Sequence, residues 1–409
     1  MAALLAAAPA AASDFDGLAI GAEELRLMAE EAGAPPPSRA GGDDAYISPS
    51  ERAGYIARAE LWRPEAELKT ASLDFASPPF PKAKYAVEEL VACSYIPMRE
   101  AYEGGKPNGL TRKFKCRDAK GKSLKVKYGA RNGEVVTEVA ASWLLTAIGA
   151  YADRMYPVRV DCEGCPSDPF KSERDPGAWT QGQACAIEDK AAERLESSRD
   201  SGIGFDEFHL IEDRAGAEAL AGLAMFLGNT DNKAENQALG CRKDDLVTGS
   251  DGGTSCRRPI VYLQDMGISF GGWSVYHNRR MHYRKWAKEK VWDDPKACVM
   301  RLREVRTSSL KGTDASGRDM HQIGERARQL LIRRLGLLTR GQLAAIFRAS
   351  RAPRQEPSHS PEEWADLFLR KVERLRRPLG DKTPADFKCP YEVVPPNSAP
   401  PPPDPFPSY

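Results

Sequence analysis

Hydrophobic positions along the chain follow strand-like spacing in some segments and helix-like spacing in others. Apolar and polar residues alternate over 111–117 and 123–128, on either side of a turn at 118–121, which predicts a β-hairpin. From 134 to 148 apolar residues recur every three to four positions and Gly149 follows, which predicts a helix that ends there. The chain therefore mixes both kinds of secondary structure from its first half onward.

The same pattern continues toward the C-terminus. We expect strands at 155–160, 184–187, 237–241 and 260–263, and helices at 23–31, 49–60, 215–227, 325–335, 341–348 and 362–376. The helix at 215–227 is apolar on most sides, which predicts that it is buried. Prolines dominate the tail after Pro390, so we expect that segment to be disordered.

Composition and breakers divide the chain into six predicted parts. They are an Ala-rich leader or truncated signal peptide (1–12), an N-terminal extension (13–84), a β-rich lobe (85–190), a helical lobe (191–351), a C-terminal helical extension (352–390) and a Pro-rich tail (391–409). Because the leader lacks a charged segment before its apolar run, a cytoplasmic location is favoured slightly over export.

Bulk composition excludes several classes of function. Hydrophobic residues make up 41% of the chain and charged residues 29%, which is typical of a globular protein. The net charge of +1 gives no overall electrostatic attraction for nucleic acid. No apolar run reaches the roughly 18 residues of a membrane span.

The nine cysteines leave the compartment open. Cys162 and Cys165 form a CxxC motif, and Cys241 and Cys256 flank a Gly-, Ser- and Asp-rich stretch. These four residues would form two local disulfides in an oxidising compartment, or hold a structural zinc ion in the cytosol, or stay free.

The most informative pattern follows the predicted buried helix. The next loop contains Asp231, Lys233 and Asn236, and a later apolar strand ends in Asp265 and Gly267. Phosphoryl transfer uses a carboxylate that faces the acceptor hydroxyl, and an amide and a second carboxylate that hold metal on the phosphates. Oxygen ligands of this kind suit Mg²⁺ or Mn²⁺. We expect Gly267 to let the backbone turn sharply beside the metal.

These residues resemble those of the protein-kinase-like superfamily. The spacing Asp231-x-Lys233-x-x-Asn236 resembles the kinase catalytic loop, and residues 228–231 with Asn236 are closer still to HipA-like kinases. Asp265-Met266-Gly267 is similar to the metal-binding Asp-Phe-Gly motif, with Met in place of Phe. The broader pattern is also similar to uncharacterised bacterial proteins. The resemblance, over about residues 95–300, implies an α+β, two-lobed kinase-like fold.

The resemblance also implies roles for residues further upstream. Lys127 is expected to contact the ATP phosphates, although Lys125 has the same strand parity. Its ion-pair partner is expected to be Glu138, one turn inside the helix, whereas Glu134 is explained by the helix N-terminus. The segment Ala186-Ile187-Glu188 occupies the position where adenine would contact main-chain groups. The phosphate-covering loop would be residues 102–109, whose glycines lack the usual spacing.

The hypothesis favoured by the sequence is an ATP-dependent phosphotransferase. Asp231 would orient or deprotonate the acceptor hydroxyl, Lys233 would neutralise the transferring group, and Asn236 and Asp265 would hold Mg²⁺ or Mn²⁺. A protein Ser/Thr, a lipid head group and a small molecule all remain open as the acceptor. Two alternatives are a pseudokinase without turnover and an exported binding protein stabilised by disulfides or zinc.

Overall fold

The computed structural model describes residues 49–391, apart from 106, 108, 110, 130–131, 171–178, 196–201, 249–253, 273–280, 304–307 and 315–316. Every described residue belongs to one compact unit. The leader, the helix expected at 23–31 and nearly all of the Pro-rich tail lie outside the described residues.

Five strands close into a barrel in the first part of the described chain. The order around the barrel is β1-β2-β3-β5-β4, and all neighbours are antiparallel except β1 and β4, which are parallel. The strands are β1 (Leu90–Ile96), β2 (Lys113–Arg117), β3 (Ser123–Lys127), β4 (Arg154–Glu163) and β5 (Gln183–Asp189). The predicted hairpin is confirmed as β2 and β3, and Gly121 closes its turn with a positive φ of 77° and a bond to Asp118 O.

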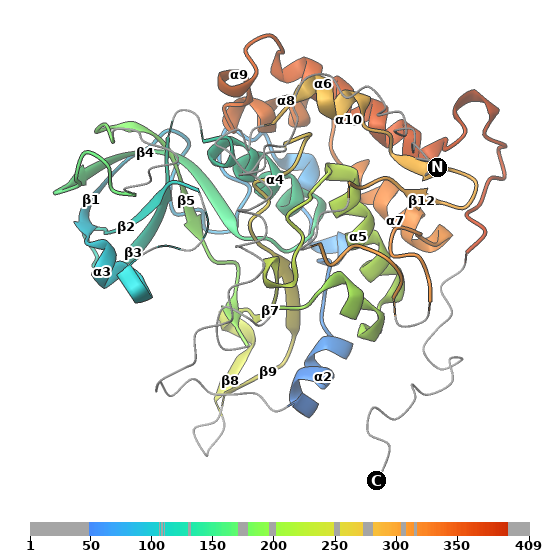
Figure 1. Ribbon diagram of the computed structural model, residues 1–409, viewed down its shortest axis with the longest axis horizontal. Coiled ribbons are helices and arrows are strands. Elements are labelled where there is room, and N and C mark those ends of the chain that lie inside the picture. The colour runs from blue at the N-terminus through green and yellow to red at the C-terminus, as the bar shows by residue number, and fades with distance from the viewer. Residues whose placement is uncertain are drawn as a thin grey trace, which may run out of the picture. The chain divides into compact units, whose positions relative to one another are not determined.

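Helix α4 (Glu134–Ile148) joins β3 to β4 and has the predicted bounds. All of its residues are buried, and it packs against β4 on one side and α8 (Arg340–Ala349) on another. The Trp143 indole donates to Met155 O at 2.9 Å, which fixes the helix to β4. Gly149 ends the helix in the left-handed conformation, as expected of a C-terminal glycine. Figure 1 shows α4 beside the barrel strands.

The second part begins with α5 (Arg214–Leu227), the predicted buried helix. Asp213 caps its start by accepting from Gly216 N at 2.9 Å, and Gly228 ends it with a φ of 68°. A three-stranded sheet of order β10-β7-β6 follows, in which β7 (Gln237–Cys241) and β10 (Pro259–Leu263) are the predicted strands and β6 is Glu193–Arg194.

Further elements complete the described chain. The helices are α2 (Pro49–Ala57), α3 (Met98–Ala101), α6 (Tyr283–Lys288), α7 (Glu325–Leu335), α9 (Ala352–Gln355) and α10 (Pro361–Arg376). The short strands are β8 (Leu246–Thr248), β9 (Thr254–Cys256), β11 (Trp292–Asp294) and β12 (Val299–Met300). The 3₁₀ helices are η1 (Glu65–Glu67), η2 (Thr70–Ser72), η3 (Glu103–Gly105), η4 (Phe205–Leu210), η5 (Ala234–Asn236), η6 (Lys243–Asp245) and η7 (Gly380–Lys382).

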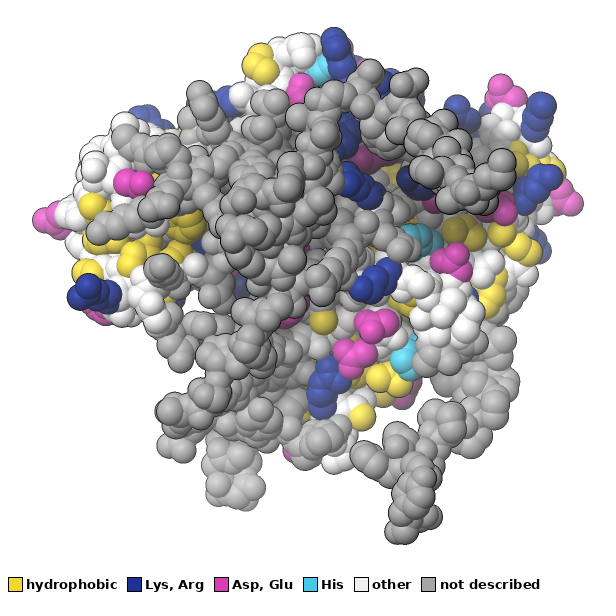
Figure 2. All heavy atoms as spheres, in the orientation of Figure 1, with side chains coloured by type: hydrophobic (Ala, Val, Ile, Leu, Met, Phe, Trp, Pro, Cys, Tyr) yellow, Lys and Arg dark blue, Asp and Glu magenta, His cyan; other side chains and the backbone are white. Residues whose placement is uncertain are grey.

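A β-rich part followed by a mainly helical part confirms the α+β class. The order is consistent with the two-lobed, kinase-like fold that the resemblance implies. Charged side chains of both signs are intermingled over the described part of the face drawn in Figure 2. Among the described residues, no helix is both long and apolar enough to span a membrane.

Eight of the nine cysteines form disulfides. Both predicted local pairs, Cys162–Cys165 and Cys241–Cys256, are bonded, so these four sulfurs are not arranged around a zinc ion. Sequence reasoning missed Cys93–Cys116, which joins β1 to β2, and Cys298–Cys389, because each partner lies far from the other in the sequence. Cys185 is buried without a disulfide.

The Cys298–Cys389 disulfide should stabilise the fold more than the Cys162–Cys165 disulfide does. The Cys298–Cys389 disulfide closes a loop of 91 residues, whereas Cys162–Cys165 closes a loop of 3. The entropy that a disulfide removes from the unfolded chain grows with the length of this loop. We expect Cys298→Ala with Cys389→Ala to lower the free energy of unfolding by about 4 kcal/mol, and Cys162→Ala with Cys165→Ala by about 2 kcal/mol. Denaturant unfolding under non-reducing conditions measures both, and equal losses would contradict the loop-length argument.

Candidate functional site

The Lys127 ammonium lies buried among carboxylates from three separate elements. Its Nζ contacts Glu138 of α4 closely, and both side chains are 3% exposed. Asp265 Oδ1, just after β10, lies 3.5 Å from the same Nζ, and Glu188 Oε2 of β5 lies at 3.7 Å. The structure therefore brings together four of the residues that the sequence singled out.

Lys127 and Lys125 differ in their surroundings because they lie at different places along β3. Both side chains project from the same face of the strand, as alternation requires. Lys127 lies at the inner end, opposite Lys113 of β2, whereas the Lys125 side chain is 31% exposed and pairs with Glu188 at 2.6 Å. The proximity of α4 and Asp265 therefore distinguishes Lys127, although its role toward a nucleotide stays a prediction.

The segment predicted to contact adenine lies inside β5. Ala186 pairs with Lys127 of β3 and Pro157 of β4, and Ile187 is likewise paired on both sides. The main chain of Ala186 and Ile187 therefore lies within the hydrogen-bonded sheet of the barrel. Of the three residues in the segment, Glu188 approaches Lys127, and it does so through its side chain. An adenine contact at these residues stays untested.

The predicted catalytic loop is held from within by asparagine side chains. Asn229 Oδ1 accepts from Asp231 N at 3.1 Å, and Asn236 Nδ2 donates to Asp231 O at 2.7 Å. Asn232 donates to Asn229 O at 2.8 Å and accepts from Ser308 Oγ at 2.7 Å. Asp231 itself is half-buried, as is Lys233 in the same loop. These amides fix the main chain on both sides of Asp231.

Strand pairing brings the predicted catalytic loop and Asp265 to the same end of a sheet. Gln237 is opposite Leu263 in the β7–β10 ladder, and one step beyond it Gln264 N donates to Asn236 O at 2.8 Å. Asn229 Nδ2 also donates to Met266 Sδ at 3.1 Å. Since the Asn236 amide nitrogen bonds to Asp231 O, the Asn236 amide oxygen is the atom suited to a metal ion.

Gly267 has a different role from the one expected. The left-handed residue in this turn is Asp265, with φ 48°, and Gly267 has no positive φ. A Cβ at Gly267 would lie 2.5 Å from Glu134 Cγ, so glycine is required for close approach to α4. Glu134 is 1% exposed and accepts from the Thr111 hydroxyl, so it is a buried neighbour of Asp265 as well as the first residue of α4.

Carboxylate oxygens of Glu134, Glu138 and Asp265 lie within 4.8 Å of one another. Sequence reasoning set Glu134 aside, although residues four apart share a helix face and Glu134 therefore lies on the same side of α4 as Glu138. The missing information was the turn at Gly267, which a single sequence does not place against α4.

Opposed effects set the protonation of these groups. Burial raises the pKa of Asp265, but the attraction of Lys127, a hydrogen bond with Glu138 and the nearby Lys113 and Lys125 together hold this pKa well below its usual range. Burial raises the pKa of Glu138 well above its usual range despite the attraction of Lys127, and the Asp265 charge adds to the rise. Burial lowers the pKa of Lys127, but the Asp265 and Glu138 carboxylates hold it well above normal.

A second polar network connects Glu188 to the segment before Asp265. Lys190 Nζ lies 2.8 Å from Glu188 Oε1 and 2.7 Å from Asp153 Oδ2. Gln264 Nε2 donates to the same Asp153 oxygen at 3.1 Å, and its Oε1 accepts from Arg194 at 3.0 Å. Asp153 and Lys190 belong to no recognisable motif, so the sequence did not identify them.

The loop between β1 and β2 contains the glycines of the predicted phosphate-covering loop, whose spacing differs from the usual kinase spacing. Gly104, Gly105 and Gly109 have positive φ, while residues 106, 108 and 110 lie outside the described chain. A Cβ at Gly109 would lie 3.5 Å from Lys113 Nζ, which puts this ammonium beneath the loop. Burial and the nearby Lys125 and Lys127 lower the pKa of Lys113 to about 8. Sequence reasoning missed Lys113.

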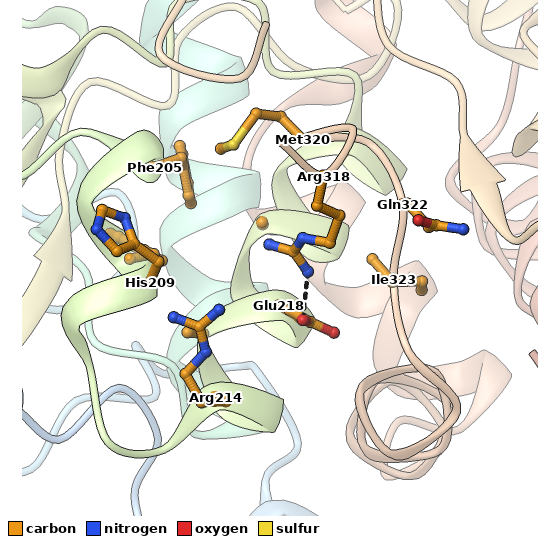
Figure 3. A pocket seen from close by; sticks show the side chains of 11 residues that line it. Phe205, His209, Arg214, Glu218, Arg318, Met320, Gln322 and Ile323 are labelled. Carbon is orange, nitrogen blue, oxygen red and sulfur yellow. Dashed lines mark hydrogen bonds and ion pairs between the residues drawn. The ribbon is translucent and has the colours of Figure 1, made fainter. Parts of the chain in front are cut away.

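A separate small pocket lies between η4, α5 and residues 318–323. Figure 3 shows Arg318 and Glu218 pointing toward one another in it, and this pair forms an ion pair. None of the predicted site residues lines this pocket.

Replacement of Lys127 should destabilise the protein far more than the same change at Lys125. Lys127→Met leaves buried carboxylates without their shared cation, so we expect a loss of about 3–5 kcal/mol in the free energy of unfolding. Lys125→Met removes a partly exposed partner of Glu188, and Lys190 remains, so we expect a loss of about 1 kcal/mol or less. Denaturant unfolding of the matched pair measures the difference, and similar losses would contradict the central position of Lys127.

Comparison with known proteins finds similarity to solved structures but none at the level of sequence families. No protein-family model and no curated protein matches the sequence. Among solved structures, the Helicobacter pylori proinflammatory kinase CtkA is similar over 69% of this chain and 92% of its own, with 11% identity and a TM-score of 0.35. A similarity of this size says nothing about activity, so function has to follow from the side chains described above.

Proposed function

We propose that this protein is an ATP-dependent phosphotransferase that transfers the γ-phosphate to a hydroxyl group. The observation that carries the proposal is the Lys127 ammonium held between Glu138 of α4 and Asp265, beside the strand ends that position Asn236. A lysine fixed by a helix glutamate next to a metal-binding aspartate is the arrangement that protein kinases use for phosphoryl transfer.

Each residue has a defined task in this proposal. Lys127 and Lys113 attract the phosphates, Asn236 and Asp265 hold the metal ion through oxygen atoms, and Asp231 orients or deprotonates the acceptor hydroxyl. Bound Mg²⁺ or Mn²⁺ supplies positive charge that offsets charge on the phosphates. Lys233, in the same loop as Asp231, neutralises the transferring group, so that catalysis is mainly electrostatic and positional.

The acceptor is any hydroxyl that reaches Asp231, whether on a protein, a lipid head group or a small molecule. Asp231 is half-buried, and the main chain on both sides of it is fixed by Asn229 and Asn236. A carboxylate held in this way retains its direction when the acceptor changes, so the acceptor is selected by surfaces around the loop.

One observation favours a pseudokinase as a second candidate. The Lys127 ammonium already faces three carboxylates, which reduces its capacity to bind phosphate oxygens. A pseudokinase would be stabilised thermally by Mg·ATP without any transfer of phosphate, because ligand binding raises apparent stability by mass action. Transfer to any hydroxyl acceptor excludes it.

We also propose that the protein works in an oxidising compartment. Four disulfides distributed over both parts of the fold are rare in cytosolic proteins, where thiol reductants keep cysteines reduced. The Cys93–Cys116 disulfide joins the two strands that flank the proposed phosphate-covering loop.

Substitution of the proposed catalytic residues should abolish phosphate transfer. We expect Asp231→Asn to lower kcat by about 10²–10⁴-fold through loss of the base or orienting group, and Asp265→Asn to lower it at least as far. The matched control is Asp161→Asn on the exposed side of β4. Transfer of radiolabelled γ-phosphate to a hydroxyl acceptor measures the effect in Mg²⁺ and in Mn²⁺. Unchanged kcat in Asp231→Asn or Asp265→Asn would contradict the assignment.

Lys113 should give the reaction an alkaline limit. Its pKa of about 8 means that it is protonated below pH 8 and loses its charge above, among Lys125, Lys127, Asp265 and Glu134. We therefore expect kcat/KM for ATP to fall as pH rises through about 8, because this ratio reports groups of the free enzyme. Lys113→Met should lower kcat/KM near pH 7 about 10- to 100-fold, as expected for a lost charged hydrogen bond, and remove this pH dependence.

Lys115→Met, on the same face of β2, is the matched control and should keep the alkaline fall. An unchanged pH profile in Lys113→Met would show that another group sets the limit.

A further inference from the structure

Glu138 contains a buried oxygen atom that no hydrogen-bond donor of the described residues reaches. Its Oε1 contacts Lys127, but its Oε2 has no donor in this part of the chain, and the side chain is only 3% exposed. An unsatisfied buried carboxylate oxygen costs free energy, more than a neutral acceptor would. A bound cation or a proton is therefore expected at this atom.

Two further carboxylates face the same position. Oxygens of Glu134, Glu138 and Asp265 lie within 4.8 Å of one another. Oxygen ligands of one octahedral Mg²⁺ are about 3.0 Å apart when adjacent and about 4.2 Å apart when opposite, so the carboxylates would need to close by up to about 1.8 Å around the ion. Gly267 makes this approach possible, because a side chain there would collide with Glu134.

Carboxylates near Lys127 outnumber its ammonium. Glu138 and Asp265 lie within ion-pair distance of it, an oxygen of Glu134 lies within 4.8 Å of an oxygen of each, and Glu188 is already paired with Lys125 and Lys190. Lys113 from β2 is a further cation near Asp265 and Glu134. A proton shared by Glu138 and Asp265 would relieve the repulsion between those two carboxylates only. A divalent cation would balance the negative charge of all three carboxylates.

We infer that Glu134, Glu138 and Asp265 together bind one divalent cation, Mg²⁺ or Mn²⁺, in the absence of nucleotide. Hard carboxylate oxygens suit these ions. The site ties α4 to the turn after β10 through two glutamates one helical turn apart. It refines the metal site of the proposed function by adding ligands from α4, but it requires no turnover.

The test is a titration of the full chain with Mn²⁺ in the absence of nucleotide, followed by the electron paramagnetic resonance of free Mn²⁺. We expect one bound Mn²⁺ per chain in the wild type. Glu134→Gln and Glu138→Gln should each weaken binding by at least about tenfold, the smallest loss typical of even an outer-shell change at a metal site. The control is Glu218→Gln, a buried carboxylate paired with Arg318, which should bind Mn²⁺ like the wild type.

Thermal unfolding establishes that each variant is folded, and Glu134→Asp replaces Glu134→Gln if the latter does not fold. The shorter side chain should also weaken binding, because it draws the carboxylate back from the ion. Absence of Mn²⁺ binding by the wild type, or wild-type affinity in the folded Glu134 variant, would overturn the inference. Phosphate transfer with wild-type Mn²⁺ affinity in the Glu134 variant overturns this inference alone, whereas Mn²⁺ binding without any transfer overturns only the proposed function.

Discussion

A single buried ammonium, that of Lys127, organises the polar centre of this protein. Carboxylates from α4, β5 and the turn after β10 all lie within ion-pair distance of it. Charges removed from water are stable only when they are paired, so each of these elements is held to the position where its carboxylate meets Lys127. The same constraint explains why Glu138 and Asp265 have pKa values that shift in opposite directions at such close range.

The constraint extends outward through hydrogen bonds rather than through apolar packing alone. Gln264 bonds to Asn236 by its main chain and to Asp153 by its side chain, and Asp153 reaches Glu188 through Lys190. The predicted catalytic loop and the barrel are thus connected on both sides of Asp265. Any displacement of α4 or of β5 would therefore also shift the turn that contains Asp265. This connection gives the proposed enzyme a physical basis for coupling nucleotide contact to metal contact.

Local patterns predicted the elements well, and long-range contacts were the part that the sequence did not reveal. The β2–β3 hairpin and α4 follow from alternation, helical spacing and glycine at the ends, all of which are local. The pairing of Lys127 with Glu138 agrees with the preference drawn from the kinase resemblance. Glu134 and Lys113 were missed because their significance depends on which turn packs against α4 and which loop covers β2, and neither contact has a local signature.

The most direct measurement is anomalous diffraction from crystals grown with Mn²⁺ and a non-hydrolysable ATP analogue. The account predicts a manganese peak about 2.1 Å from a carboxylate oxygen of Asp265, with Glu138 and Glu134 beside it and the analogue's phosphates facing Lys127 and Lys113. A map in which manganese and nucleotide both avoid this cluster, with a hydrogen bond joining Glu138 to Asp265 in their place, would contradict it.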